Sequence, residues 1–171
     1  GHEMTIAVNV SPVQIRRDDL PGRVRQVLRK TGLPAAALEL EITESLMMGE
    51  DTQALETLSA LKAIGIKLAI DDFGTGYSNL AYLKRFNVDR LKIDQSFVRN
   101  IDSKPDAAAI VNAVIVMGRQ LGLNTLAEGV ETEAERDALR TAGCDDIQGY
   151  LLGKPMPAEA IDALLKAPPR A

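Results

Sequence analysis

The sequence predicts an α/β fold: a TIM-like (β/α) barrel, present here as an incomplete barrel of about six βα units. Short β-rich runs alternate with longer amphipathic runs along the 171 residues, and parallel strands need such crossover connections. Polar residues lie at or near the ends of the β-rich runs, where barrel enzymes carry their active sites. A complete barrel of eight units takes about 250 residues, so a chain of 171 accommodates fewer.

The expected strands are short runs rich in aliphatic and β-branched residues. They span 5–10, 38–43, 66–71, 90–94, 124–129 and 145–150. Between them, apolar residues recur at helical spacing, in the segments 20–28, 55–61 and 110–121. Thr132 and Glu135 make a capping-box pattern, and Gly32 and Gly122 stand where helices should end. These signals predict a parallel sheet with a helix after most strands.

Composition narrows the class of protein. With 46% hydrophobic and 26% charged residues, the chain is expected to form one globular domain over 1–166, followed by a tail or linker at 167–171. The net charge of -4 argues against binding a nucleic acid polymer. The sequence has no long apolar run and no signal peptide, so we expect a cytoplasmic domain without membrane contact of its own.

Cysteine and histidine content limits the chemistry. Cys144 is the single cysteine, which excludes an internal disulfide and suits a reducing compartment. His2 is the single histidine and lies at the chain terminus, which argues against a histidine metal site or a Ser-His-Asp triad. Any metal is therefore expected to be held by oxygen ligands.

The candidate site consists of polar residues at successive strand ends. They are Asn9, Glu41, Asp71, Asp72, Lys92, Glu128 and Gln148. A turn rich in Asp and Gly explains one such position, and Lys92 or Glu41 alone fits a structural ion pair. Chance turn chemistry does not explain an amide, carboxylate or lysine at six consecutive strand ends. The pattern therefore favours an active site at one end of a barrel.

Several carboxylates in one pocket repel one another unless cations neutralise them. Mg²⁺ and Mn²⁺ prefer carboxylate and amide oxygens. Two such ions about 3.5–4 Å apart share an activated water in phosphodiester hydrolysis. Lys92 is then expected to orient that water, to neutralise phosphate charge, or to accept the proton if its own pKa is depressed.

At these residues the sequence strongly resembles the EAL-domain family of cyclic di-GMP phosphodiesterases. The matching motifs are VNVSP at 8–12, ELEITES at 39–45, DDFGTGYSNL at 71–80, LKIDQSFV at 91–98, AEGVET at 127–132 and QGYLLGKP at 148–155. The resemblance implies hydrolysis of cyclic di-GMP to linear pGpG with two Mg²⁺ or Mn²⁺ ions per complete site. It also implies a homodimer of the parent protein, with any membrane anchorage supplied by other domains.

The resemblance assigns roles to individual residues. The implied metal ligands are Asn9, Glu41, Asp71, Asp72 and Glu128. Lys92 matches the general base or water-positioning lysine, Glu131 a glutamate near that lysine, and Gln148 the glutamine near the attacking water. Glu44 matches the glutamate that anchors the following loop. That loop comprises Phe73, Gly74, Thr75, Gly76, Tyr77 and Ser78.

Departures from the family pattern matter as well. The Glu-Ala-Leu motif is not in its expected place, because the chain starts at what should be the third strand of the family. The resemblance therefore implies that two strands, one glutamate metal ligand and one phosphate-binding arginine are missing, and we expect a weak or inactive isolated chain. Leu152 replaces an aromatic that packs on a guanine in many relatives.

Two other functions stay open at this point. A degenerate EAL domain would serve as a cyclic di-GMP receptor or a protein-interaction module, although such relatives usually lose ligands or the loop motif. Another magnesium barrel enzyme, such as an enolase-like lyase with a lysine base, would abstract a proton rather than hydrolyse a phosphodiester.

Overall fold

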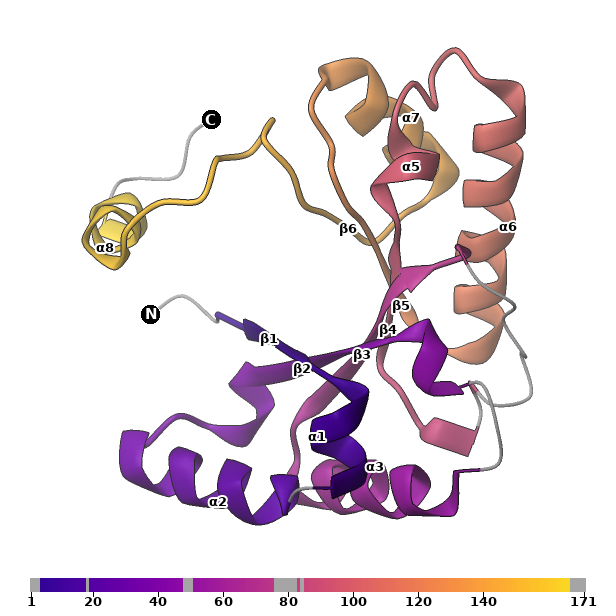
Figure 1. Ribbon diagram of the computed structural model, residues 1–171. Helices are drawn as coiled ribbons and strands as arrows, with labels where there is room; N and C mark the ends of the chain where they lie inside the picture. Colours follow the sequence, from indigo (N-terminus) through magenta and orange to yellow (C-terminus); the bar gives the residue numbers. More distant parts are fainter. Residues whose placement is uncertain (1–3, 18, 48–50, 76–82, 84, 167–171) are drawn as a thin grey trace.

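The computed structural model describes residues 4–17, 19–47, 51–75, 83 and 85–166. Its sheet has six parallel strands in the order β1-β2-β3-β4-β5-β6. The strands are β1 (Ile6–Val10), β2 (Leu38–Thr43), β3 (Lys67–Phe73), β4 (Arg90–Ile93), β5 (Asn124–Ala127) and β6 (Asp146–Ile147). Within the described part of the chain, β1 and β6 are the edges of an open sheet, which confirms the predicted incomplete barrel (Figure 1).

The helices other than α8 lie outside the curved sheet. The α-helices are α1 (Pro12–Arg17), α2 (Leu20–Thr31), α3 (Thr52–Ile64), α5 (Gln95–Val98), α6 (Pro105–Leu121), α7 (Glu133–Ala142) and α8 (Ala158–Lys166). In Figure 1, α2 and α3 lie below the first strands, and α6 lies along the right-hand side of the molecule. Helix α8 stands apart from this layer, at the left of the same view.

The helix ends follow from local sequence. The Asp19 side chain accepts a hydrogen bond from the Gly22 amide at the start of α2. The capping box predicted at Thr132 and Glu135 is present at the start of α7. Gly32 ends α2 with a φ of 72°, a left-handed conformation that glycine adopts without a Cβ penalty.

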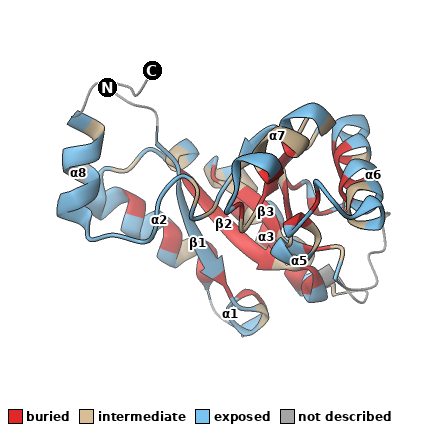
Figure 2. Ribbon diagram, turned by 90° about the horizontal axis from the view of Figure 1, so that it is seen from above, coloured by how far each residue is buried: buried red, intermediate tan, exposed pale blue. Residues whose placement is uncertain are grey.

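The core lies between the sheet and the outer helices. Figure 2 shows buried residues along the central strands and on the helix faces turned toward them. The periodic pattern located α6 correctly, but Ile110 and Leu121 from that pattern are 41% and 40% exposed. Val114 from that pattern is buried, but its buried neighbours on α6 are Val111 and Ile115, which the pattern did not include. Spacing alone therefore found the helix without fixing its buried stripe.

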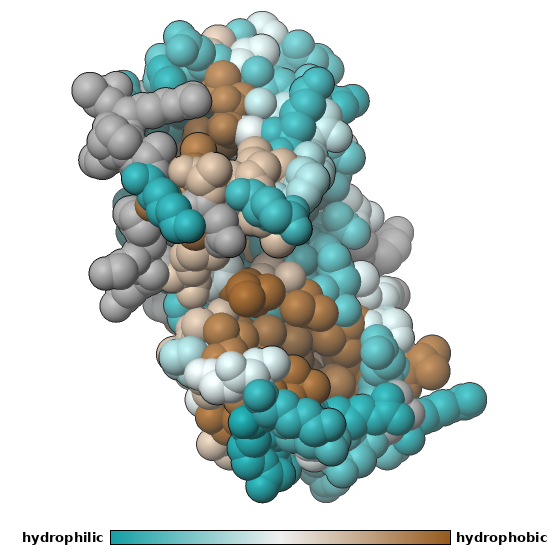
Figure 3. Space-filling view, turned by 90° about the vertical axis from the view of Figure 1, so that its left-hand side faces the viewer, coloured by the Kyte–Doolittle hydropathy of each residue, from teal (hydrophilic) through white to brown (hydrophobic). Residues whose placement is uncertain are grey.

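Strand β1 has an outer face that is open to solvent. Ile6 and Val8 are 47% and 44% exposed, whereas Leu38 and Leu40, their register partners on β2, are buried. Figure 3 views the molecule from the left-hand side of Figure 1 and shows an apolar patch in the lower half of that face. At Ile6 and Val8 the outer face of β1 thus lacks the cover that β2 has within the described residues, whereas Val10 at the end of the strand is buried.

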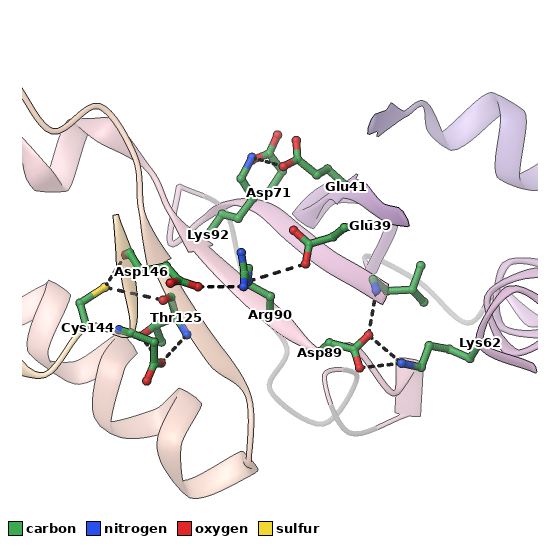
Figure 4. Close-up of polar contacts among 12 residues, drawn as sticks. Glu39, Glu41, Lys62, Asp71, Asp89, Arg90, Lys92, Thr125, Cys144 and Asp146 are labelled. Carbon is green, nitrogen blue, oxygen red and sulfur yellow. Dashed lines mark hydrogen bonds and ion pairs between the residues drawn. The ribbon is translucent and has the colours of Figure 1, made fainter. Parts of the chain in front are cut away.

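Asp89 ties the start of β4 to α3 and β3. Its two carboxylate oxygens lie 2.6 Å from Lys62 Nζ, and Oδ2 also accepts a hydrogen bond of 2.8 Å from the Leu68 amide (Figure 4). The Asp89 amide in turn donates to the Leu68 carbonyl over 2.8 Å. These contacts fix where β4 begins, and β4 carries Lys92 three residues later.

We expect Asp89→Ala to lower the free energy of unfolding by about 1–3 kcal/mol, because it leaves the Leu68 amide without its carboxylate acceptor. Lys62→Met removes only a partly exposed ion pair and should cost about 0–1 kcal/mol. Urea unfolding of both variants at pH 7 measures the difference. Equal losses would mean that the ion pair, and not the amide hydrogen bond, holds this junction.

Candidate active site

The predicted site residues lie at one end of the sheet, on or just after successive strands. Asn9 and Glu41 are register partners on β1 and β2, so their side chains share one face of the sheet. Asp71 lies near the end of β3, and Lys92 on β4. Glu128 and Gln148 directly follow β5 and β6. Asn9, on the edge strand, is exposed.

A β-bulge at the end of β3 explains how two adjacent aspartates serve one site. Ile70 pairs with Leu91 and Phe73 pairs with Ile93, so Asp71 and Asp72 together oppose a single residue of β4. Asp72 also has a φ of 54°, a left-handed conformation that aspartate tolerates better than most residues. Neighbouring residues of a regular strand point to opposite faces. The bulge removes that alternation and allows both carboxylates to approach Glu128.

Three carboxylates form a cluster suited to a metal ion. One oxygen from each of Asp71, Asp72 and Glu128 lies within 4.8 Å of the others. Burial, followed by the charges of Asp71 and Asp94, raises the pKa of Asp72. Burial also raises the pKa of Glu128, although Lys92 opposes this effect. Raised pKa values mean that the site disfavours its own negative charge, which a hard divalent cation would neutralise.

Lys92 is buried at the centre of this end of the sheet, only 3% exposed. Its Nζ lies 2.8 Å from Glu41, from Asp71 and from Glu128 (Figure 4 shows the first two). Burial opposes the charge of the ammonium, but hydrogen bonds to the three carboxylates outweigh it and raise the pKa of Lys92 above its ordinary value. In the metal-free protein these carboxylates therefore favour the charged form of Lys92, which is the opposite of the depressed pKa that a general base needs.

A cavity of about 330 Å³ adjoins the carboxylate cluster. Its lining includes Asp72, Glu128, Glu131 and Gln148 from the predicted set. Larger cavities of about 550 and 640 Å³ lie around the opposite strand ends, near residues such as Lys67. They lack the carboxylate cluster, so the smaller cavity is the chemically relevant one.

The structure adds two charged residues to this cavity that the sequence analysis did not select. Asp94 and Arg99 both line it, and Asp94 raises the pKa of Asp72. Asp94 follows Lys92 by two residues and comes directly after β4, and this position at a strand end was a signal that could have identified it. Glu131, which the resemblance places near the lysine, forms its ion pair with Arg99 at 3.6 Å. Lys92 forms its ion pairs with Glu41, Asp71 and Glu128.

The loop after β3 is held by Glu44. This residue is 5% exposed, and its Oε2 accepts a hydrogen bond of 3.2 Å from the Gly74 amide. Thr75 closes back on the strand through a 2.9 Å hydrogen bond from Oγ1 to the Asp72 carbonyl. Gly74 has a φ of 99°, which requires glycine. Gly76, Tyr77 and Ser78, the remainder of the expected loop, lie outside the described residues.

Among the described helices, none combines the length and the apolar character that crossing a membrane requires.

The chain is similar in sequence and in fold to proteins of one known family. A family model described as EAL domain matches residues 1–155. MucR of Pseudomonas aeruginosa, a bifunctional diguanylate cyclase/cyclic di-GMP phosphodiesterase, is 46% identical over 162 residues, which cover 94% of this chain and 24% of MucR. The chain spans only 20–24% of the length of the first four curated relatives.

Two solved structures are also similar. PaMucR phosphodiesterase in complex with c-di-GMP has a TM-score of 0.87 and 46% identity, covering 92% of this chain and 64% of its own. Klebsiella pneumoniae BlrP1 in complex with manganese and c-di-GMP has a TM-score of 0.80 and 37% identity, covering 86% of this chain and 38% of its own. The family match over most of the sequence, together with these relatives, shows that the chain belongs to the EAL domain family.

Proposed function

We propose that the chain carries the catalytic face of a metal-dependent cyclic di-GMP phosphodiesterase, which hydrolyses its substrate to linear pGpG. The observation that carries this proposal is the convergence of Glu41, Asp71 and Glu128 on Lys92, beside the Asp71–Asp72–Glu128 cluster. Relatives named as phosphodiesterases and neighbours solved with c-di-GMP support the choice of substrate.

The donor set fits a hard divalent cation, because every ligand that it offers is an oxygen. Asp71, Asp72 and Glu128 would hold the metal, with Asn9 and Glu41 as further ligands. Two bound Mg²⁺ or Mn²⁺ ions would supply an activated water and neutralise phosphate charge. The neighbour solved with manganese and c-di-GMP supports this choice of metal.

The side chains of the chain have separate tasks in the reaction. Lys92, a buried cation, orients the attacking water and offsets phosphate charge. Gln148 lines the cavity and positions the same water through its amide. The water oxygen bonds to phosphorus while one phosphorus–ribose oxygen bond breaks. The departing ribose oxygen takes up a proton in place of the one that the water loses, so the cyclic dinucleotide opens to a linear one with a ribose hydroxyl and a phosphate monoester at the cut. Glu131 belongs to this set by resemblance and stays a prediction.

A cyclic di-GMP receptor is the second candidate, and it would bind the ligand without turnover. Membership of the EAL domain family argues against the lyase alternative. The cytoplasmic location and the homodimer expected from the resemblance stay predictions.

We expect the full-length protein encoded by the gene to hydrolyse cyclic di-GMP with Mg²⁺ or Mn²⁺, and to lose turnover when EDTA removes the metal. Ca²⁺ should inhibit, because its larger and looser coordination positions the water poorly. Chromatographic detection of pGpG measures the activity. Metal-independent binding without any pGpG would favour the receptor function.

Lys92→Ala should lower kcat by about 100-fold or more while cyclic di-GMP binding largely survives, because water orientation matters mainly in the transition state. Lys30→Ala, at an exposed position on α2, is the matched control and should leave kcat unchanged. Steady-state kinetics measure both variants. A raised KM with unchanged kcat would reduce Lys92 to a substrate contact.

Glu44→Ala should lower kcat by about 100-fold without removing a proposed metal ligand, because a displaced loop moves Asp72 by a distance that matters for catalysis. Glu44→Gln retains an oxygen that can accept from the Gly74 amide and should recover most activity. Kinetics and thermal unfolding together test this. If Glu44→Ala unfolds the protein, the activity of the folded Glu44→Gln variant tests the role of Glu44 instead. Low activity of Glu44→Gln would contradict a role limited to the hydrogen bond with the Gly74 amide.

A further inference from the structure

The cavity beside the carboxylate cluster poses a charge problem for an anionic substrate. Four carboxylate residues line it: Asp72, Asp94, Glu128 and Glu131. Arg99 is the one basic residue among its described lining residues. Bound metal ions would neutralise carboxylates at the Asp72–Glu128 side. The positive charge next to Glu131 comes from Arg99, which forms an ion pair with it.

Arg99 lines the cavity, and its guanidinium keeps N–H donors available for a ligand. Its Nη2 lies 3.6 Å from Glu131 Oε1, an ion-pair contact longer than a hydrogen bond. The Arg99 side chain is 59% exposed, and a guanidinium offers five N–H donors in a planar fork. This fork matches the geometry of phosphate oxygens, which it can bind through two parallel hydrogen bonds.

One buried carboxylate fixes the backbone on both sides of this ion pair. Glu135 is 5% exposed, and its Oε1 accepts a 3.1 Å hydrogen bond from the amide of Asn100, the residue after Arg99. Its Oε2 accepts from the amides of Glu131 and Thr132 at 2.9 and 3.0 Å. Asn100 has a φ of 59°, so this carboxylate stabilises a turn that most residues disfavour.

Glu135 therefore does more than cap α7. A capping box requires its contact with Thr132, but not its contact with Asn100, 35 residues earlier in the chain. Through Asn100 and Glu131, the same side chain sets the spacing between the segment that carries Arg99 and the segment that follows Glu128.

We propose that Arg99 binds a phosphate group of the cyclic dinucleotide and that Glu135 is the positioning residue that holds Arg99 and Glu131 in register. This assignment rests on the proposed function and deepens it. Arg99 acts on substrate binding, and its ion pair joins Glu131 rather than the carboxylates that contact Lys92.

The first test compares Arg99→Ala, Arg99→Lys and Arg140→Ala in the full-length protein with Mn²⁺. Arg140 lies on α7 with its side chain 81% exposed and does not line the cavity, so it is the matched control. Arg99→Ala should raise KM for cyclic di-GMP by about 10- to 100-fold with kcat within about threefold, the loss expected for a charge-assisted hydrogen bond. Arg99→Lys should recover part of the affinity, since it keeps the charge but loses the fork.

The second test is a double-mutant cycle between Arg99→Ala and Glu135→Ala. If Glu135 acts through Arg99, Glu135→Ala raises KM in the parent background and adds little to the KM of Arg99→Ala. Glu133→Ala, at an exposed position in the same helical turn, should change neither. Additive effects on KM would overturn the positioning role. If Glu135→Ala fails to fold, Glu135→Gln takes its place in the cycle, because it keeps the side-chain length and one acceptor.

The outcomes separate this assignment from the proposed function. No binding or hydrolysis of cyclic di-GMP by the unaltered protein overturns the proposed function, and the assignment falls with it. An active protein in which Arg99→Ala leaves KM unchanged overturns the assignment alone. An effect of Arg99→Ala confined to kcat also overturns it.

Discussion

The ion cluster around Lys92 is the interaction on which the site end of the sheet depends. A buried ammonium needs compensating charge, and removing one partner from such a cluster is costly. The partners come from three other places in the sheet: Glu41 on β2, Asp71 on β3 and Glu128 after β5. Strands distant in sequence are thereby tied together at the end where the cavity opens. The same contacts that hold the strands also gather the oxygens that a metal would use.

A second charged layer lies one step deeper on the same face. Arg90 precedes Lys92 by two residues, and Glu39 precedes Glu41 by two, so each pair shares a side of its strand. Arg90 contacts Asp146 at 2.8 Å and Glu39 at 3.6 Å (Figure 4). Burial raises the pKa of Glu39. Barrel interiors are usually filled by branched aliphatic side chains. Here charge pairs fill these layers and link β2, β4 and β6.

The sequence predicted the parallel sheet because the alternation of β-rich and helical runs and the polar residues near strand ends are local signals. It placed the ends of the last two strands too late, at 129 and 150, whereas β5 ends at Ala127 and β6 at Ile147. It did not predict that Asp71 and Asp72 share a bulge, since a register shift depends on pairing with β4. Arg99 and its contact with Glu131 were missed because they join segments 32 residues apart, and an exposed arginine in a helix-end segment has no distinguishing pattern. Residue types at strand ends were therefore enough to predict the site residues. Contacts between segments distant in the sequence could not be predicted in this way.

The proposed metal ligands are not held with equal rigidity. Asp71 lies on a strand paired on both sides and contacts buried Lys92. Asn9 lies on β1, an edge strand in the described sheet, where Ile6 and Val8 are exposed on the outer face. A strand with few buried contacts can detach locally from the sheet at a low cost in free energy. The geometry at Asn9 therefore depends on the stability of β1, whereas in the metal-free protein the geometry at Asp71 and Glu128 depends on Lys92. Any interaction that covers the outer face of β1 would consequently tighten the Asn9 side of the site without touching a ligand.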